Sequence, residues 1–514
     1  MHRQLGFWSL TTVGLGSIIG SGWLFGALYG ARAAGPAALL SWLIAGGAFA
    51  LIALVLAELG AGRPESGALV RWPLRANGPL VAAVVGWSVL LAIGAATASE
   101  ASAIAQYANR YVPGLYRGGV LTPRGLLCSV LLLAVLVAVN WFGVRVFARV
   151  NAVVTTLKFL VPAGTALLML ASGFHPEHLT AGGFAPYGWA AVLSAVASGG
   201  IIFSVNGFAS IVELSGEARN PRRDIPRAVL TAIALAVALY LLLQLAFLLA
   251  VPDALLVHGW RGIDLSSPFG ELALLLGLGW LAGVLYADAV LSPAGSALVG
   301  AAEDSRKGYA LAKNGLIPGF FADVHPASGV PRRALLGTFA FSLLWLVPFR
   351  GWQEIVSVLG DLFLLTYSAS AVAGGVFHAA EPERRAGAVR GLRWISPLSF
   401  VVATEIVYWS TWDKLGAGLP LAAGGVLVFG LSRQGRAAFG AELRRGLWLV
   451  VHLAVLFAVS GLGSFGGAGW LPAPWDSALV AVAAVLIYRW GVRSGIAVQR
   501  TPGTATQNEF SGRP

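Results

Sequence analysis

The chain has 514 residues, of which 57% are hydrophobic and 11% charged, and its mean hydropathy is +0.76. A soluble domain carries about 25% charged residues, so this composition excludes a water-soluble globular protein and predicts a chain solvated by lipid. The formal net charge of +12 does not indicate a nucleic-acid partner, because the basic residues lie in short clusters between long apolar runs. The single cysteine, Cys128, excludes a disulfide framework and a cysteine metal site.

Long apolar runs follow one another along the chain. A span needs about 20 mostly apolar residues, and the runs predict an all-α polytopic membrane protein with about fourteen transmembrane helices and no cleavable signal peptide. The predicted spans cover residues 7–32, 36–60, 80–108, 125–143, 149–172, 188–213, 227–251, 270–300, 333–350, 354–379, 394–412, 415–432, 446–463 and 476–492.

The basic residues orient these spans. With the N-terminus in the cytoplasm, 27 lysines and arginines fall on the cytoplasmic side and 7 outside, and Lys158 is the remaining one of the 35. We therefore expect a multi-pass protein of the cell membrane whose N- and C-termini are cytoplasmic. Tryptophans near predicted span ends, among them Trp8, Trp352 and Trp394, are expected to form interfacial belts.

Two predicted spans contain polar, glycine-rich interruptions. In the first span residues 16–22 read GSIIGSG, and in the sixth residues 198–200 read SGG and residues 203–208 read FSVNGF. Close helix packing is the structural alternative for glycines four residues apart. Interruptions five spans apart instead indicate discontinuous helices 1 and 6 in an inverted five-plus-five repeat. The exposed N–H groups of such breaks suit a carboxylate and the exposed carbonyls suit an ammonium, which are the two groups of an α-amino acid.

This interpretation divides the chain into four parts. Residues 1–172 form the first inverted repeat with helices 1–5, and residues 188–379 form the second with helices 6–10. Residues 394–492 form the extra C-terminal helices 11–14, and residues 493–514 form a cytoplasmic tail.

Several segments resemble the amino acid–polyamine–organocation superfamily. They are GSIIGSG at 16–22, AEL at 57–59 with PESG at 64–67, GFASIVELSGEARNPRRDIPRAV at 207–229, and SRKGYALAKNGLIPGFF at 305–321. The similarity covers roughly residues 5–350 and implies a leucine-transporter-like fold of ten core helices with extra C-terminal helices. Within the superfamily, DAVLSP at 288–293 resembles the group of proton-linked permeases that includes the aspartate–proton symporter.

The resemblance also implies a substrate site. The substrate carboxylate would lie on backbone N–H groups of the first interruption, around Ser17, Ile18, Gly20, Ser21 and Gly22. The substrate amine would meet the second interruption, near Phe203, Ser204, Asn206 and Gly207. Many members carry an acidic residue directly after the glycine and phenylalanine of this segment, and here that position is Ala209.

Lys158 is a cation within the fifth predicted span. It follows Asn151 by seven residues, about 10 Å into the bilayer. The structural alternative is a side chain that snorkels to the cytoplasmic surface. The resemblance implies instead an ammonium in the place that a sodium ion takes in related carriers, near Gly14 and Ser292, where it couples transport to a proton.

Glu100 in the third span and Asp288 in the eighth are carboxylates near the membrane middle. A carboxylate there is costly unless it is protonated, paired or hydrated, so each is interpreted as a substrate-site residue or a proton carrier. A structural hydrogen bond to another helix is the alternative. Asp361 and Glu405 are expected mainly at helix contacts.

Together these features predict a secondary active, proton-coupled amino-acid transporter that works by alternating access. Its partners would be an amino acid, a proton and the lipid bilayer, and we expect no cofactor, no metal and no catalytic residue. A polyamine or organic-cation carrier and an amino-acid exchanger are alternatives. A membrane-embedded enzyme or a channel is more remote, because the sequence contains no HExxH pair and no repeated filter-like segment.

Overall fold

The structure is a computed structural model that describes residues 5–64, 67–141, 147–313, 315, 317–326, 328–349, 351–384 and 387–500. Glu65 and Ser66 of the PESG segment lie outside the described residues, as do positions 501–514 of the predicted tail. The same holds for several of the basic residues used to orient the spans: Arg3, Arg145, Arg350, Arg385 and Arg513.

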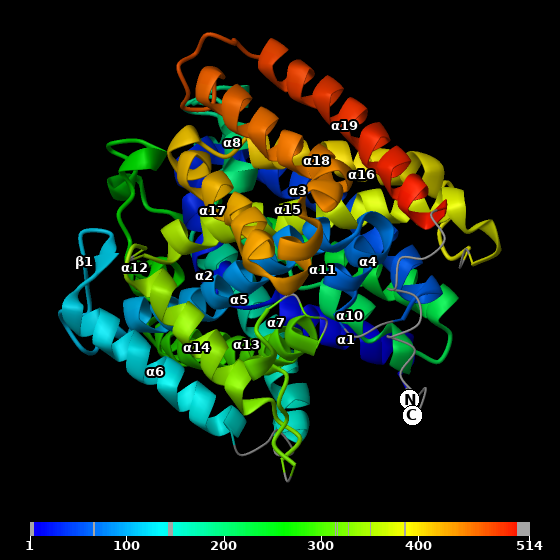
Figure 1. The fold of residues 1–514 in the computed structure, drawn as a ribbon. Coiled ribbons are helices and arrows are strands. Elements are labelled where there is room, and N and C mark those ends of the chain that lie inside the picture. The colour runs from blue at the N-terminus through cyan, green and yellow to red at the C-terminus, as the bar shows by residue number, and fades with distance from the viewer. Residues whose placement is uncertain are drawn as a thin grey trace.

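The described chain is largely helical (Figure 1). The helices before residue 220 are α1 (Phe7–Ile18), α2 (Gly22–Ala34), α3 (Ala38–Gly62), α4 (Ala68–Asn77), α5 (Pro79–Ala108), α6 (Pro123–Trp141), α7 (Phe147–Ser172), α8 (Trp189–Ser198), α9 (Ile201–Val205) and α10 (Ala209–Glu213). Those after it are α11 (Pro221–Ala250), α12 (Pro268–Leu275), α13 (Gly279–Lys313), α14 (Arg332–Leu346), α15 (Trp352–Ala380), α16 (Leu392–Tyr408), α17 (Trp412–Leu431), α18 (Arg433–Leu462) and α19 (Trp475–Arg500).

Short elements connect these helices. The 3₁₀ turns are η1 (Gly35–Ala37), η2 (Pro176–Leu179), η3 (Ser215–Glu217), η4 (Asp253–Leu255), η5 (Trp260–Gly262), η6 (Gly319–Phe321) and η7 (Pro382–Arg384). Between α5 and α6, β1 (Tyr116–Arg117) pairs antiparallel with β2 (Val120–Leu121), so that Tyr116 lies opposite Leu121.

Ten helical runs among the described residues are long and apolar enough to cross a membrane, and the bent pair Trp189–Ser198 and Ile201–Glu213 would make eleven. The chain is therefore a multi-pass membrane protein, but the predicted count of fourteen spans is not confirmed. One reason is length, because α1, α14 and α16 have 12, 15 and 17 residues and a span needs about 20. Another is that α2 and α3 form one run, Gly22–Gly62, which the prediction divides between two spans.

The helices differ in whether they lie in the interior of the bundle or at its periphery. Helices α5 and α15 pack against each other and are almost completely buried over their apolar windows. Helix α6 lies at the periphery and exposes four large apolar side chains at four-residue spacing: Leu127, Leu131, Val135 and Val139. An apolar stripe on one helix face that meets neither water nor core is suited to lipid chains.

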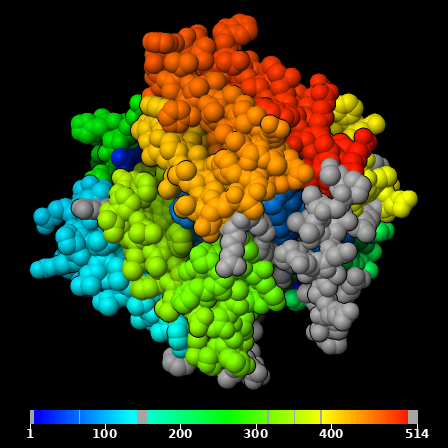
Figure 2. All heavy atoms as spheres, viewed as in Figure 1, coloured from blue at the N-terminus to red at the C-terminus, as the bar shows by residue number. Residues whose placement is uncertain are grey.

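The C-terminal helices cover one side of this bundle. Helix α16 packs on α3 and α15, α17 packs on α5, and α18 and α19 pack on each other. In the view of Figure 1 α18 and α19 lie at the upper edge, and Figure 2 shows their orange and red atoms as a continuous surface there. The two interrupted segments, α1–α2 and α8–α10, pack mainly against α3, α11 and α15.

Candidate functional site

The first interruption lies between α1 and α2. Helix α1 ends at Ile18, Ile19 has extended dihedral angles, and α2 begins only at Gly22. The N–H of Gly20 reaches the carbonyl of Ile18 at 3.1 Å, and the N–H of Ser21 bonds a side chain of another helix. The N–H of Ile19 still bonds the carbonyl of Leu15, whereas those of Gly20 and Ser21 leave the regular helical hydrogen-bonding pattern, inside the GSIIGSG segment.

The second interruption has two steps. Helix α8 ends at Ser198, and Gly200, with φ +73°, turns the chain so that the axis bends by 54°. Helix α9 then ends at Val205, Asn206 is extended, and Gly207 takes φ +118°. Side chains other than hydrogen rarely adopt positive φ, so both glycines are needed where they stand.

The two interruptions touch each other through two of these glycines. A Cβ atom on Gly22 would lie 2.8 Å from the Cα of Ser204, and one on Gly207 would lie 2.6 Å from the carbonyl oxygen of Ser17. Both distances are far below ordinary van der Waals contact. The backbones can approach this closely only because neither position has a side chain.

Glu100 of α5 binds the first interruption. Its Oε2 accepts a hydrogen bond from the N–H of Ser21 at 3.0 Å, and Oε1 lies 3.3 Å from the same nitrogen. A Cβ on Gly20 would lie 2.5 Å from Oε1. The carboxylate thus occupies the N-terminal end of α2, where unpaired N–H groups and the helix dipole favour negative charge.

Lys158 of α7 binds the same interruption from its other side. Its Nζ donates to the carbonyl of Gly16 at 3.2 Å and to Ser296 Oγ of α13 at 2.6 Å. The side chain is buried, so the snorkelling alternative is wrong. Its predicted neighbours, Gly14 and Ser292, are replaced by Gly16 and Ser296, because the turn of each helix that faces the ammonium differs from the one assumed.

The charges of Glu100 and Lys158 attract each other across the interruption. The Ser296 hydroxyl, which accepts from Lys158, also points to the carbonyl of Ile19 at 3.5 Å. One carboxylate and one ammonium from two different helices therefore hold the N–H and carbonyl groups that the broken helix releases.

A cavity of about 150 Å³ lies beside the two interruptions. This is roughly ten times the minimum that holds one water molecule. Seven of the eleven predicted substrate-binding residues line it: Ser17, Ile18, Gly20, Glu100, Phe203, Asn206 and Gly207. Four others do not belong to its lining: Ser21, Gly22, Ser204 and Asp288.

Trp352 of α15 joins the two interruptions and packs against Phe203, which lines the cavity. Its Nε1 donates to Ser21 Oγ at 2.7 Å, and a Cβ on Gly200 would lie 2.8 Å from its ring. The Phe203 ring meets it edge-on with centroids 5.7 Å apart. Because Trp352 is completely buried, its prediction as an interfacial anchor is wrong, whereas Trp8 and Trp394 are exposed.

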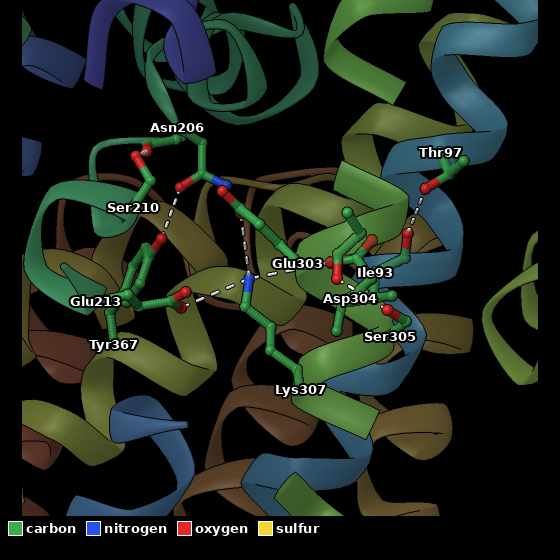
Figure 3. Close-up of polar contacts among 12 residues, drawn as sticks. Ile93, Thr97, Asn206, Ser210, Glu213, Glu303, Asp304, Ser305, Lys307 and Tyr367 are labelled. Carbon is green, nitrogen blue, oxygen red and sulfur yellow. Dashed lines mark hydrogen bonds and ion pairs between the residues drawn. The ribbon is translucent and has the colours of Figure 1, made fainter. Parts of the chain in front are cut away.

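A charged cluster at the other end of the cavity was missed by the sequence analysis (Figure 3). Lys307 Nζ lies 3.5 Å from Glu213 Oε1 of α10 and 3.9 Å from oxygens of both Glu303 and Asp304 on its own helix. The three- and four-residue spacing on α13 was visible in the sequence. The partner Glu213 was not, because it comes from a different element nearly a hundred residues earlier.

Asn206 is fixed above this cluster by α15. Tyr367 donates its hydroxyl hydrogen to Asn206 Oδ1 at 2.6 Å, as Figure 3 shows. Both residues line the cavity, together with Glu303, Asp304 and Lys307. The bond from Tyr367 uses the Asn206 carbonyl oxygen, so the NH₂ group of this cavity-lining amide remains a hydrogen-bond donor.

The other intramembrane carboxyl groups differ in their surroundings. Asp361 accepts a hydrogen bond from Ser410 at 2.8 Å, which is a contact between helices. Asp288 Oδ2 and both oxygens of Glu405 are buried and make no hydrogen bond among the described residues.

Three side chains outside the bundle could hold a metal ion. One ligand atom each of His175, His178 and Asp253 lie within 4.8 Å of one another. His178 already bonds the carbonyl of Leu248 through Nδ1 and Asp253 Oδ1 through Nε2, at 3.2 and 2.7 Å. The hydrogen bond from His178 lowers the pKa of Asp253 below its usual range. A metal would have to displace the hydrogen bond between His178 and Asp253. The observed contacts are therefore those of polar side chains that join two loops.

Comparison with known proteins gives a consistent result. Residues 5–414 match a family described as amino acid permease. The chain is 37% identical to the glutamate/serine transporter AimA of Bacillus subtilis, with 96% of this chain and 94% of that protein covered. It is 34% identical to the aspartate–proton symporter of the same organism, with 96% and 97% covered.

One solved structure shares the fold at low sequence identity. A manganese transporter of Eremococcus coleocola superposes with a TM-score of 0.53 and 15% identity, covering 89% of this chain and 98% of that one.

Proposed function

Because this chain belongs to the amino acid permease family, we propose that it is a proton-coupled secondary transporter of zwitterionic or acidic amino acids. The observation that carries this proposal is the pair of interruptions in contact beside a cavity, with Glu100 and Lys158 bonded to the freed backbone groups of the first. Relatives named as transporters of glutamate, serine and aspartate support the substrate class.

The proposed architecture is the inverted five-plus-five repeat. Helices α1 and α2 would be the two halves of helix 1, and α8 to α10 would be the parts of helix 6. Residues 1–172 and 188–379 would be the two repeats, and α16 to α19 would be the four extra helices, which gives fourteen in all. The positions of the two interruptions and the likeness of fold to a solved transporter support this arrangement.

The substrate would bind where the interruptions meet. The Glu100 carboxylate lines the cavity and is suited to the substrate's ammonium group, together with carbonyls of the interrupted segments. The substrate carboxylate would take the Asn206 amide and N–H groups released near Ser17, Ile18 and Gly20. The ring of Phe203 would cover the bound molecule under Trp352.

Proton binding would act through Lys158. A charged Lys158 joins α1 to α13 by holding the Gly16 carbonyl and the Ser296 hydroxyl at once. Loss of its proton weakens both bonds, so the protonation state of Lys158 would bias the position of α1 against α7 and α13. With both termini in the cytoplasm of a cell-membrane protein, the cavity beside Lys307 would face inward, and alternating access would require this path to close.

Transport by purified protein in liposomes tests the proposal. Labelled aspartate, glutamate and serine should accumulate when the outside is acidic, and unlabelled substrate inside should accelerate entry by counterflow. Competition by putrescine instead would indicate the cation carrier. Counterflow without any response to a pH gradient would indicate an exchanger, and entry without trans-stimulation would indicate a pore and contradict the proposal.

A further inference from the structure

Helix α13 presents a polar stripe toward the bundle interior. Asp288, Ser292 and Ser296 follow one another at four-residue spacing, so their side chains lie on one face of the helix. Ser296 is the hydroxyl that accepts from Lys158. The other two lie one and two turns further along, about 6 and 12 Å from Ser296 at 1.5 Å per residue.

The outer two groups of this stripe are buried without partners. Asp288 is 5% exposed and Ser292 is 0% exposed, yet Asp288 Oδ2 and Ser292 Oγ make no hydrogen bond among the described residues. The indole of Trp23 interacts with the Asp288 carboxylate, but its Nε1 does not reach hydrogen-bond geometry with it. Buried polar atoms of this kind normally form hydrogen bonds with protein or with ordered water. Each buried donor or acceptor that lacks such a bond costs about 1–3 kcal/mol of stability.

Asp288 is separate from the substrate cavity but within the electrostatic reach of Lys158. It is absent from the cavity lining, whereas Glu100 belongs to it. The charges of Asp288 and Lys158 attract each other. An ionisable group in a membrane interior that neither pairs directly nor meets the cavity is a candidate for proton movement.

Further polar groups lie toward the end of α13 opposite Lys307, and Tyr107 of α5 interacts with both Asp288 and Tyr286 there. The hydroxyl groups of Tyr286 and Ser267 are hydrogen bonded at 2.8 Å, and Ser267 Oγ donates to Glu271 Oε1 at 3.0 Å. The ring of Tyr286 contacts Tyr111, which is largely exposed. The ionisable groups around Asp288 are therefore Tyr286 on its own helix, Glu100 and Tyr107 on α5, Lys158 on α7 and Glu271 on α12.

We propose that Asp288 is a proton relay between the outer aqueous phase and Lys158, and that ordered water bonded to Trp23 and Ser292 completes the connection. A hydronium ion at the outer end gives its proton to the Asp288 carboxylate and becomes water. The resulting carboxylic acid passes that proton, through the water bonded to Ser292, to the neutral amine of Lys158. The amine becomes ammonium as Asp288 returns to carboxylate. This relay rests on the proposed function, because it supplies the proton that the transporter uses.

The substitution Asp288→Asn tests the relay, since asparagine has the same shape and cannot bind the proton. In liposomes we expect accumulation of labelled aspartate driven by a pH gradient to fall by at least about tenfold. Counterflow of the same substrate, which needs no net proton movement, should keep its KM. The matched control is Asp361→Asn, because Asp361 is also 5% exposed but bonds Ser410, and it should retain accumulation.

Each other result has a distinct meaning. Unchanged accumulation in Asp288→Asn would overturn the relay, and a raised counterflow KM would overturn it by placing Asp288 on the substrate. If Asp288→Asn does not fold, Ser292→Ala provides the test, with slower pH-driven uptake at normal counterflow expected and normal uptake contradicting the relay. Absence of counterflow by the unmodified protein for aspartate, glutamate and serine would contradict the proposed function itself.

Discussion

The two interruptions satisfy their freed backbone groups by different means. At the first, the groups are bonded by side chains from other helices: Glu100 from α5, Lys158 from α7 and Ser296 from α13. At the second, the carbonyls of Gly200 and Gly207 accept backbone bonds from the N–H groups of Ser204 at 3.0 Å and Ser210 at 3.2 Å, and the hydroxyls of the same two serines also donate to them, each at 2.8 Å.

This difference predicts that the two interruptions respond differently to changes in charge and to changes in conformation. A backbone held by ionised groups responds to protonation and to a charged ligand, whereas a backbone held by its own hydroxyls depends mainly on conformation. We therefore expect charge-changing substitutions to act on transport through the first interruption. Substitutions at the second should act on stability, except where the two segments touch.

The largest effect is expected for Gly207→Ala, which attacks the contact between the segments. The new methyl group would lie 2.6 Å from the carbonyl oxygen of Ser17, at a φ of +118°. We expect a loss of at least about 2 kcal/mol in unfolding free energy and no detectable transport. Thermal unfolding and uptake measure both. Gly283→Ala is the control, because nothing lies within 4 Å of its Cβ position, and equal damage there would contradict the argument.

The next effect is expected for Lys158→Ala. It removes the ammonium shared by Gly16 and Ser296, so accumulation driven by a pH gradient should be lost, while the unmade buried bonds cost about 1–3 kcal/mol. Lys313→Ala, at the exposed C-terminal end of α13, should transport normally. Unaltered pH-driven accumulation in Lys158→Ala would rule out its coupling role.

Glu100→Gln should have a smaller, more specific effect. Glutamine can still accept from the Ser21 N–H, so stability should change by no more than about 1 kcal/mol. In the proposed site the Glu100 charge would face the substrate's ammonium, so its loss should raise the counterflow KM by about tenfold or more. A KM equal to that of the unmodified protein would mean that Glu100 is only a structural cap.

The smallest effects are expected for Ser204→Ala and Ser210→Ala. Each removes one local hydroxyl bond to a carbonyl of the second interruption, which should cost about 0.5–1.5 kcal/mol and leave the counterflow KM unchanged. Ser368→Ala provides the comparison, because Ser368 makes the same four-residue bond to Leu364 within an uninterrupted helix. The carbonyls of Gly200 and Gly207 also keep backbone N–H partners, so all three substitutions should lower the melting temperature by similar amounts.

The backbone features of the site were predictable from local sequence. Clustered glycines and serines at 16–22 and 198–208 signal where helical bonding stops, and an isolated lysine in an apolar run signals a buried cation. These are properties of one segment at a time. The family likeness, the membrane class and the amino-acid substrate class of the relatives were reached on the same basis.

The partners of these groups were not predictable. Glu100 reaches Ser21 from 79 residues away, Trp352 reaches it from 331 residues away, and Glu213 reaches Lys307 from another element. Such pairs depend on the rotation of each helix about its axis, and an error of one turn is enough to replace Ser292 by Ser296. The count of fourteen spans stays unconfirmed for a related reason, because apolar length alone does not reveal where short helices end.

The position of Trp352 has a mechanical consequence for both segments. One rigid indole is hydrogen bonded to Ser21 and wedged against Gly200, so neither segment can draw away from α15 without disturbing the surface that the other rests on. Displacement of this ring is thus a single event shared by two helices. The two interrupted segments would accordingly move in one step and not independently.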